Sequence, residues 1–206
     1  MRKRRVRLKI QGIARTKLGT DGHGVTDLVA MAGCPLSCEH CLNKKLLAEA
    51  PVRDVSAADL LTDVMEEACY FVATGGGVAF GGGEPLLQWE EIVEFAGIMP
   101  DWMQLTIETS LQAPRRAIET LLPVTDLWFV DIKSLDPSIY ARYTHGSLDV
   151  ALSNLQLLLP VADKVKVRVP SIPGYKGRDV AEAEGNEVRR MGFSDVEVFD
   201  YVVRND

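Results

Sequence analysis

Short apolar runs alternate with amphipathic stretches along most of this 206-residue chain. The apolar runs predict six strands, at residues 26–33, 78–80, 103–108, 127–132, 164–169 and 195–202. Helical spacing predicts helices at residues 56–74, 87–99, 115–122, 148–159 and 179–191, and a further helix opened by Asp136 and Pro137. Repeated strand–helix units build a parallel sheet with outer helices. Six units fall short of the eight that close a barrel. The prediction is an α/β fold, an open three-quarter (βα)6 barrel, although periodicity alone also allows a flat doubly wound sheet.

The N-terminal segment precedes this pattern and is strongly basic, with six Lys or Arg among the first nine residues. Val6, Leu8 and Ile10 alternate with charged residues there, which predicts an edge strand with one solvated face. No repeat, low-complexity tract or long linker divides the chain. We therefore expect a single domain over residues 1–206.

Composition limits the classes of partner and the compartment. The net charge of -6 argues against nucleic acid as a partner. Neither a signal-peptide core nor an apolar run of about 18 residues is present, so no membrane association is expected. Only four cysteines occur, three of them clustered, which does not resemble a secreted disulfide framework. We expect a reducing, cytoplasmic location.

Three cysteines lie in the run GCPLSCEHC: Cys34, Cys38 and Cys41, with the spacing C-x3-C-x2-C. Three thiolates can hold three irons of a [4Fe–4S] cluster, which needs a fourth ligand. Cys69 lies in an apolar helical stretch and is expected in the core, so one iron is left open to a small molecule. A zinc site is the alternative, but its fourth ligand would be His40, inside the same tight loop.

The other candidate residues each follow a predicted strand. They are residues 81–84 after the second strand, 108–110 after the third, Asp131 and Lys133 after the fourth, and Arg168 at the end of the fifth. In barrels, active sites form at that edge. Glu108 and Asp131, at adjacent strand ends, would repel unless a cation lies between them, and oxygen ligands suit alkali or alkaline-earth ions. Arg168 either pairs with a ligand carboxylate or forms a surface salt bridge.

The cysteine spacing resembles that of the radical S-adenosylmethionine (SAM) superfamily, and the resemblance covers residues 19–203. In that superfamily the three cysteines hold a [4Fe–4S] cluster, and a GGE motif, here within residues 81–84, recognises the amino group of SAM. The residue before the third cysteine is commonly aromatic and packs by the adenine; here it is His40. The resemblance implies the same roles in this chain.

Further segments resemble the glycyl-radical-enzyme activating enzymes of the pyruvate formate-lyase type. Asp21-Gly22-His23-Gly24 matches their D-G-P-G segment at the same distance from the first cysteine, and CLN, which ends at Asn43, matches their C-H-N. Residues 108–110 and 131–133 resemble their D-T and D-L-K segments. Glu108 stands in place of that group's aspartate, and Val202 in place of its histidine.

This resemblance assigns a role to most of the candidate residues. The catalytic set is Cys34, Cys38, Cys41, Asp21 (near the substrate backbone) and Lys133. Cofactor binding falls to His40, Asn43, Gly81, Gly82, Gly83, Glu84, Glu108, Ser110, Lys133 and Arg168. A monovalent cation, Na⁺ or K⁺, would be ligated by side-chain oxygens of Glu108 and Asp131 and backbone oxygens of Thr109 and Phe129.

The function implied is reductive cleavage of SAM to a 5′-deoxyadenosyl radical, which takes hydrogen from a glycine of a partner glycyl radical enzyme. Flavodoxin or ferredoxin would supply the electron, and an exposed cluster would require anoxic conditions. Two alternatives remain. One is a small-molecule radical SAM enzyme of the 7-carboxy-7-deazaguanine synthase type, whose usual C-D-T after the last cysteine is absent here. The other is a non-enzymatic iron–sulfur electron carrier.

Overall fold

The computed structural model of the protein describes residues 7–202. Its sheet has eight strands in the order β3-β1-β2-β4-β5-β6-β7-β8. Their bounds are β1 Leu8–Leu18, β2 Val25–Met31, β3 Arg53–Val55, β4 Gly77–Gly81, β5 Gln104–Thr109, β6 Leu127–Asp131, β7 Val165–Ser171 and β8 Asp195–Asp200. The six predicted strands are parallel and lie in chain order. A doubly wound sheet would instead reverse its strand order part-way. Within the described residues the sheet does not close, so the open barrel is confirmed.

The N-terminal strand is not at the edge of the sheet, so that prediction is wrong. β1 pairs antiparallel with β2 on one side and with β3 on the other. β3 has only three residues, two of them charged, which is too few to show a strand pattern, so the sequence did not predict it. The alternation itself is confirmed, because Leu8 and Ile10 are buried whereas Lys9 is exposed. Val6 lies outside the described residues.

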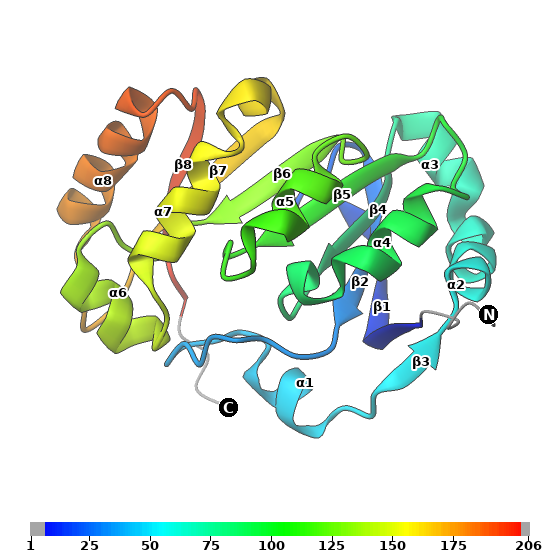
Figure 1. The fold of residues 1–206 in the computed structure, drawn as a ribbon, viewed down its shortest axis with the longest axis horizontal. Helices are drawn as coiled ribbons and strands as arrows, with labels where there is room; N and C mark the ends of the chain where they lie inside the picture. The colour runs from blue at the N-terminus through cyan, green and yellow to red at the C-terminus, as the bar shows by residue number, and fades with distance from the viewer. Residues whose placement is uncertain (1–6, 203–206) are drawn as a thin grey trace.

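Helices cover one face of the sheet, and Figure 1 shows α4, α5 and α7 lying across it. The helix bounds are α1 Lys44–Glu49, α2 Ala57–Val64, α3 Ala68–Thr74, α4 Trp89–Ala96, α5 Arg115–Leu121, α6 Pro137–Thr144, α7 Leu148–Gln156 and α8 Arg178–Arg190. The short 3₁₀ segments are η1 Met65–Glu67, η2 Pro85–Gln88 and η3 Leu159–Lys164. Within residues 7–202, none of the helices combines the length and apolar character needed to cross a bilayer.

The long helix predicted over residues 56–74 is broken into α2 and α3 by η1. At the break, Arg15 of β1 donates a hydrogen bond to the Asp63 carbonyl at 3.0 Å and lies 3.4 Å from the Glu66 carboxylate. Arg15 comes from a segment far away in the sequence, so its contact leaves no sign in the hydrophobic periodicity of residues 56–74. Cys69, expected in the core, is exposed on α3, because this helix turns only Phe71 fully into the core.

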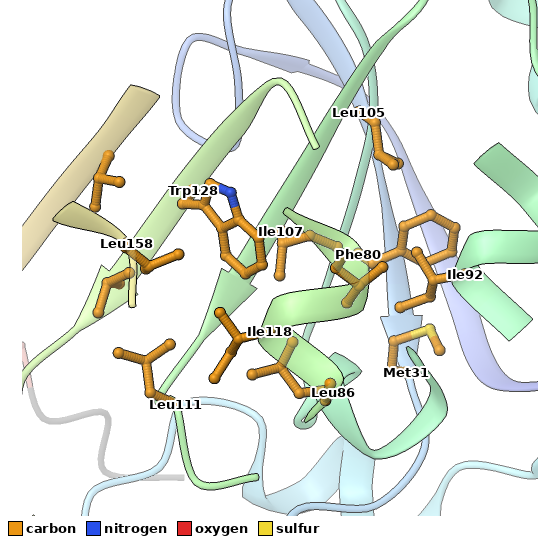
Figure 2. Close-up of a cluster of buried hydrophobic side chains, with 14 of the residues drawn as sticks. Met31, Phe80, Leu86, Ile92, Leu105, Ile107, Leu111, Ile118, Trp128 and Leu158 are labelled. Carbon is orange, nitrogen blue, oxygen red and sulfur yellow. The ribbon is translucent and has the colours of Figure 1, made fainter. Parts of the chain in front are cut away.

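Alternate residues of the parallel strands point to opposite faces of the sheet. One set packs against the helices and forms the core, which Figure 2 shows around Trp128, Ile107 and Ile118. Trp128 is fully buried there. The other set, on the concave face, includes polar and charged residues. Because side chains alternate between the two faces, each strand contributes apolar residues to the core and polar residues to the face on which a site can form.

Candidate active site

Strand register brings charged side chains together on the concave face. In the parallel sheet, Glu108 of β5 pairs with Phe129 of β6, and Asp131 of β6 pairs with Arg168 of β7. Because the strands are parallel, their carboxyl ends lie at one edge. In Figure 1 that edge lies toward the bottom, above the loop that joins β2 to α1.

A cavity of about 660 Å³ opens at this edge. Most of the predicted site residues line it: Asp21, Cys34, Cys38, Cys41, Asn43, Gly82, Gly83, Glu84, Glu108, Thr109, Ser110, Phe129, Asp131, Lys133 and Arg168. The two that do not are His40 and Gly81. The convergence on one edge, inferred from strand ends alone, is present in the structure.

The cysteine loop is anchored on the C-terminal end of α6. The backbone N–H of Ser37 donates to the carbonyl of Thr144 at 3.0 Å, and that of Glu39 donates to the carbonyl of Tyr143 at 3.2 Å. These are carbonyls of the last helical turn, which lack partners within the helix. The end of α6 thus fixes the backbone around Cys38.

His40 lies behind the loop rather than in the cavity. Its ring packs 5.8 Å from that of Tyr143 and 6.3 Å from that of Tyr175, and its Nε2 lies 3.3 Å from the carbonyl oxygen of Pro173. The hydroxyl of Tyr201 donates to the His40 carbonyl at 2.6 Å. In this structure His40 supports the loop, and a contact with adenine stays a prediction.

The three thiols are partly exposed at the cavity. Burial raises the pKa of Cys34 to about 11. Burial also raises the pKa of Cys38, although Lys133 opposes this. Metal ligation requires the thiolate. The surroundings of Cys34 and Cys38 therefore favour the neutral thiols until a cationic ligand compensates the charge.

The glycine loop after β4 fits closely against the backbone that precedes Cys34. A Cβ on Gly83 would lie 2.2 Å from the Gly33 carbonyl oxygen and 2.5 Å from that of Met31. Across the same contact, the N–H of Glu84 donates to the carbonyl of Gly33 at 2.9 Å. Asn43 Nδ2 donates to the carbonyl of Gly82 at 2.9 Å. Only glycine allows this approach, which fixes the two loops relative to each other.

Glu84 is buried and fully hydrogen-bonded. One carboxylate oxygen accepts from the Thr109 hydroxyl at 2.6 Å and from the N–H of Leu86 at 3.2 Å. The other accepts from the N–H of Ser110 at 2.9 Å and from its hydroxyl at 2.6 Å. Burial raises the pKa of Glu84, and the hydrogen bonds from Ser110 and Thr109 oppose that rise. The carboxylate therefore joins the glycine loop rigidly to the end of β5.

The charged residues of β5, β6 and β7 form a second cluster. Arg168 Nε donates to Asp131 Oδ1 at 2.8 Å, and an Arg168 terminal nitrogen lies 3.7 Å from Glu108 Oε2. Lys133 Nζ donates to the other oxygen of Asp131 at 3.1 Å. Burial alone would raise the pKa of Asp131, but Lys133 and Arg168 lower it overall. Arg168 thus forms salt bridges, but inside the cavity rather than on the surface.

Glu108 differs from Asp131 in its titration. Burial raises its pKa from the ordinary 4.5 to about 8, with Arg168 opposing and Asp21 and Asp131 adding to the rise. Its Oε1 is buried and has no hydrogen-bond partner among the described residues. Asp21, from the β1–β2 loop, accepts a hydrogen bond from the hydroxyl of Thr20 and lies 3.6 Å from Lys17 Nζ. The loop thereby brings a third carboxyl group into the lining of the cavity.

Comparison with known proteins identifies the family of this chain. The family model described as Radical SAM superfamily matches residues 28–184. The chain belongs to the radical SAM superfamily. Membership implies a [4Fe–4S] cluster and SAM as cofactors.

Two relatives are activating enzymes. The chain is 35% identical over 122 residues to the (2S)-3-sulfopropanediol dehydratase activating enzyme of Klebsiella oxytoca, which covers 59% of this chain and 38% of that protein. It is 32% identical over 167 residues to the pyruvate formate-lyase-activating enzyme of Staphylococcus aureus strain USA300, covering 77% of this chain and 66% of that protein. The chain thus spans less than two thirds of the length of both relatives. These matches confirm the resemblance expected from the motifs.

Among solved structures, QueE from Escherichia coli shares the fold with a TM-score of 0.58 and 17% sequence identity, covering 95% of this chain and 84% of that one. At this identity the likeness concerns the fold alone. It agrees with an open, partial barrel in the radical SAM domain.

The donor set of this radical SAM domain fits an iron–sulfur cluster. Cys34, Cys38 and Cys41 are free thiols on one anchored loop, and all three line a cavity that is also bounded by the glycine loop. Thiolates are the usual ligands of such clusters. Among residues 7–202, no three His, Cys, Asp or Glu side chains form a group that could hold a single metal ion. Three free thiols on one loop that lines the cavity are the kind of donor that the cluster needs, so residues 34–41 fit it.

A monovalent cation between Glu108 and Asp131 fits less well. The repulsion argument assumed two carboxylates with no charge between them, whereas the structure has the Arg168 guanidinium there. The cation therefore stays a prediction from the resemblance.

Some residues of the radical SAM site were not predicted. Tyr143 is fully buried, lines the cavity and has no partner for its hydroxyl among the described residues. Tyr201 holds the cysteine loop, and Lys17 pairs with Asp21. Tyr143 has the helical spacing of a core residue, and Tyr201 lies beyond β8, so only the topology brings them to the site.

Proposed function

We propose that the protein is an oxidoreductase that cleaves SAM with a [4Fe–4S] cluster and activates a partner glycyl radical enzyme. One electron breaks the C5′–S bond of SAM, giving methionine and a 5′-deoxyadenosyl radical. This radical takes the α-hydrogen of a glycine in the partner, leaving 5′-deoxyadenosine and a glycyl radical. The observation that carries the proposal is the meeting of the cysteine and glycine loops at one cavity, in a chain 32% identical to an activating enzyme.

Each part of the site has a role in this proposal. Cys34, Cys38 and Cys41 would hold the cluster, which when bound supplies a low-potential electron. The network of Glu84, Thr109 and Ser110 fixes the glycine loop against which the amino group of SAM would lie. Lys133 and Arg168 present positive charge to the cavity, where they can attract the carboxylate of SAM.

The partner would reach the site through the open side of the barrel. Within the described residues β3 and β8 are the two edges of the sheet and do not pair with each other. A peptide loop can enter such an opening, whereas a closed barrel would exclude it. Asp21, which lines the cavity, is proposed to contact the backbone of that loop.

We also propose flavodoxin or ferredoxin as the electron donor, in an anoxic and reducing cytoplasm. The reason is chemical: the cluster must be reduced before SAM is cleaved, and the four cysteines are free thiols.

The test begins with anaerobic reconstitution of the protein with iron and sulfide, followed by SAM and dithionite. Formation of 5′-deoxyadenosine is expected, and its absence would favour the electron-carrier alternative. Candidate glycyl radical enzymes are then added, and a glycyl-radical EPR doublet is expected from one of them. SAM cleavage that never yields a protein radical, but modifies a small molecule, would favour the small-molecule alternative.

Cysteine variants supply the matched control. Cys34→Ala, Cys38→Ala and Cys41→Ala should each abolish SAM cleavage and lower the iron content. Cys69→Ala, at the exposed cysteine on α3, should retain both. Equal loss in all four variants would indicate general damage rather than loss of cluster ligands.

A further inference from the structure

The cluster of Glu108, Asp131 and Arg168 contains its own positive charge. The register places Asp131 directly opposite Arg168, and both side chains line the cavity. The guanidinium contacts Asp131 at 2.8 Å and reaches within 3.7 Å of Glu108. It therefore bridges two carboxylates from two different strands.

The ring of Phe129 also contacts the guanidinium of Arg168. The guanidinium carbon lies 5.2 Å from the centre of the Phe129 ring, within the range of a cation–π contact. The Arg168 side chain is only 20% exposed and that of Glu108 only 13%. The guanidinium group is planar and rigid, so it loses little conformational entropy for each hydrogen bond that it forms. Arg168 is thus a fixed part of the cluster.

Cationic side chains already lie beside the carboxyl groups of the cluster. Asp131 contacts both Arg168 and Lys133, and Asp21 lies 3.6 Å from Lys17. Glu108 shares Arg168 with Asp131. The three carboxylates therefore have three cationic side chains near them. An added cation would have to displace the guanidinium or lie against it.

We propose that the guanidinium of Arg168 takes the place of a metal cation between Glu108 and Asp131, so that this protein binds SAM without a monovalent cation. Arg168 acts as a positioning residue. Through its hydrogen bond to Asp131 and its approach to Glu108 it holds the ends of β5 and β6 in the arrangement that faces SAM. The inference rests on the proposed function only in taking SAM as the ligand.

The first experiment compares K⁺ with tetramethylammonium at equal ionic strength, because the organic cation is too large to enter the cluster. Thermal unfolding of the cluster-free chain and calorimetric SAM binding to the reconstituted protein are measured in each salt. The wild type should give the same Tm and the same Kd in both. A several-fold tighter Kd or a clearly higher Tm in K⁺ would overturn the proposal.

The second experiment removes the guanidinium. Arg168→Gln leaves the two carboxylates without their shared partner, so K⁺ should now raise the Tm of the variant by roughly 2–5 °C at saturation and tighten SAM binding. Lys166→Gln is the matched control, since Lys166 lies two residues earlier on β7, lines the same cavity and also faces the Phe129 ring. The Tm of this control and its Kd for SAM should be the same with and without K⁺. An Arg168→Gln protein that folds and whose Tm and Kd also do not respond to K⁺ would overturn the proposal.

A structural measurement covers the case in which Arg168→Gln does not fold. Crystals of the wild-type protein soaked in Tl⁺, which mimics K⁺, should show no anomalous peak between Glu108 and Asp131, and a peak there would refute the inference. Wild type that binds no SAM in any salt would count against the proposed function, while the Tm and Tl⁺ results would still decide the role of Arg168.

Discussion

Asp131 and Arg168 lie directly opposite each other on β6 and β7, and the Arg168 Nε donates to Asp131 Oδ1 at 2.8 Å on the cavity side of the sheet. The pair follows from two simple features, the register of parallel strands and the alternation of side chains between faces. Lys133 contacts the second oxygen of Asp131. The same acid thus connects the ends of two strands and the loop that leaves β6.

Replacing Asp131 should therefore destabilise the fold. Asp131→Asn leaves Arg168 and Lys133, whose side chains are 20% and 14% exposed, without their common anion. Loss of one partner of a mostly buried pair is expected to lower the free energy of unfolding by about 2–3 kcal/mol. Urea unfolding of the cluster-free chain measures this loss.

The control for Asp131→Asn is Glu197→Gln, which breaks the looser Lys166–Glu197 pair between β7 and β8. That pair is 3.7 Å apart and its side chains are 32% and 50% exposed. Its loss should cost less than about 1 kcal/mol. Equal losses in the two variants would contradict the view that burial gives the Asp131 pair its importance.

Glu108 should make the stability of the fold depend on pH. Its pKa rises from 4.5 to about 8 on folding, mainly through burial, so between these values the folded state holds more protons than the unfolded state. Stability is then full at low pH and falls as the pH rises through the folded pKa. Because Arg168, Asp21 and Asp131 also act on the Glu108 carboxyl, the size of the effect is on the order of a few kcal/mol.

Glu108→Gln, which imitates the protonated acid, should flatten this dependence. Urea unfolding at pH 6 and pH 8 should show a smaller loss of stability in the variant than in the wild type. Glu119→Gln, at an exposed acid on α5, should leave the wild-type dependence unchanged. A wild-type protein whose stability rises over this range would show that Glu108 is ionised in the folded state.

The sequence predicted the parts of this structure that depend on local pattern. Hydrophobic periodicity located the six parallel strands, and their carboxyl ends correctly grouped Cys34, Glu84, Glu108, Asp131 and Arg168 at one cavity. Strand ends suffice for this because parallel strands share a polarity. No contact between particular side chains was needed.

The features that were missed depend on contacts between distant segments. β3 forms only because it pairs with β1, and the Arg15 contact coincides with the break between α2 and α3. The charge between Glu108 and Asp131 was misjudged for the same reason. A repulsion argument made on two acids could not include an arginine on the next strand, whose register is fixed only by the folded sheet.

Gly83 offers a test of the contact between the glycine loop and the cysteine loop. Gly83→Ala would place a Cβ 2.2 Å from the Gly33 carbonyl oxygen, so one of the two backbones must move. We expect a loss of stability of roughly 2 kcal/mol or more and weaker cluster retention. Gly12→Ala is the control, because no atom lies within 4 Å of a Cβ at that position. A Gly83→Ala protein as stable as the Gly12→Ala control would mean that the loops are not in contact.

The last prediction concerns Tyr201, whose hydroxyl donates to the carbonyl of His40 within the cysteine loop at 2.6 Å. Tyr201→Phe removes this bond and keeps the ring, so the loop should loosen by about 1 kcal/mol while the fold remains. The reconstituted variant should then lose iron to a chelator roughly fivefold faster than the wild type. Tyr70→Phe, at an exposed tyrosine on α3, should release iron at the wild-type rate. If Tyr201→Phe also releases iron at that rate, the loop is held sufficiently by its backbone bonds to Tyr143 and Thr144.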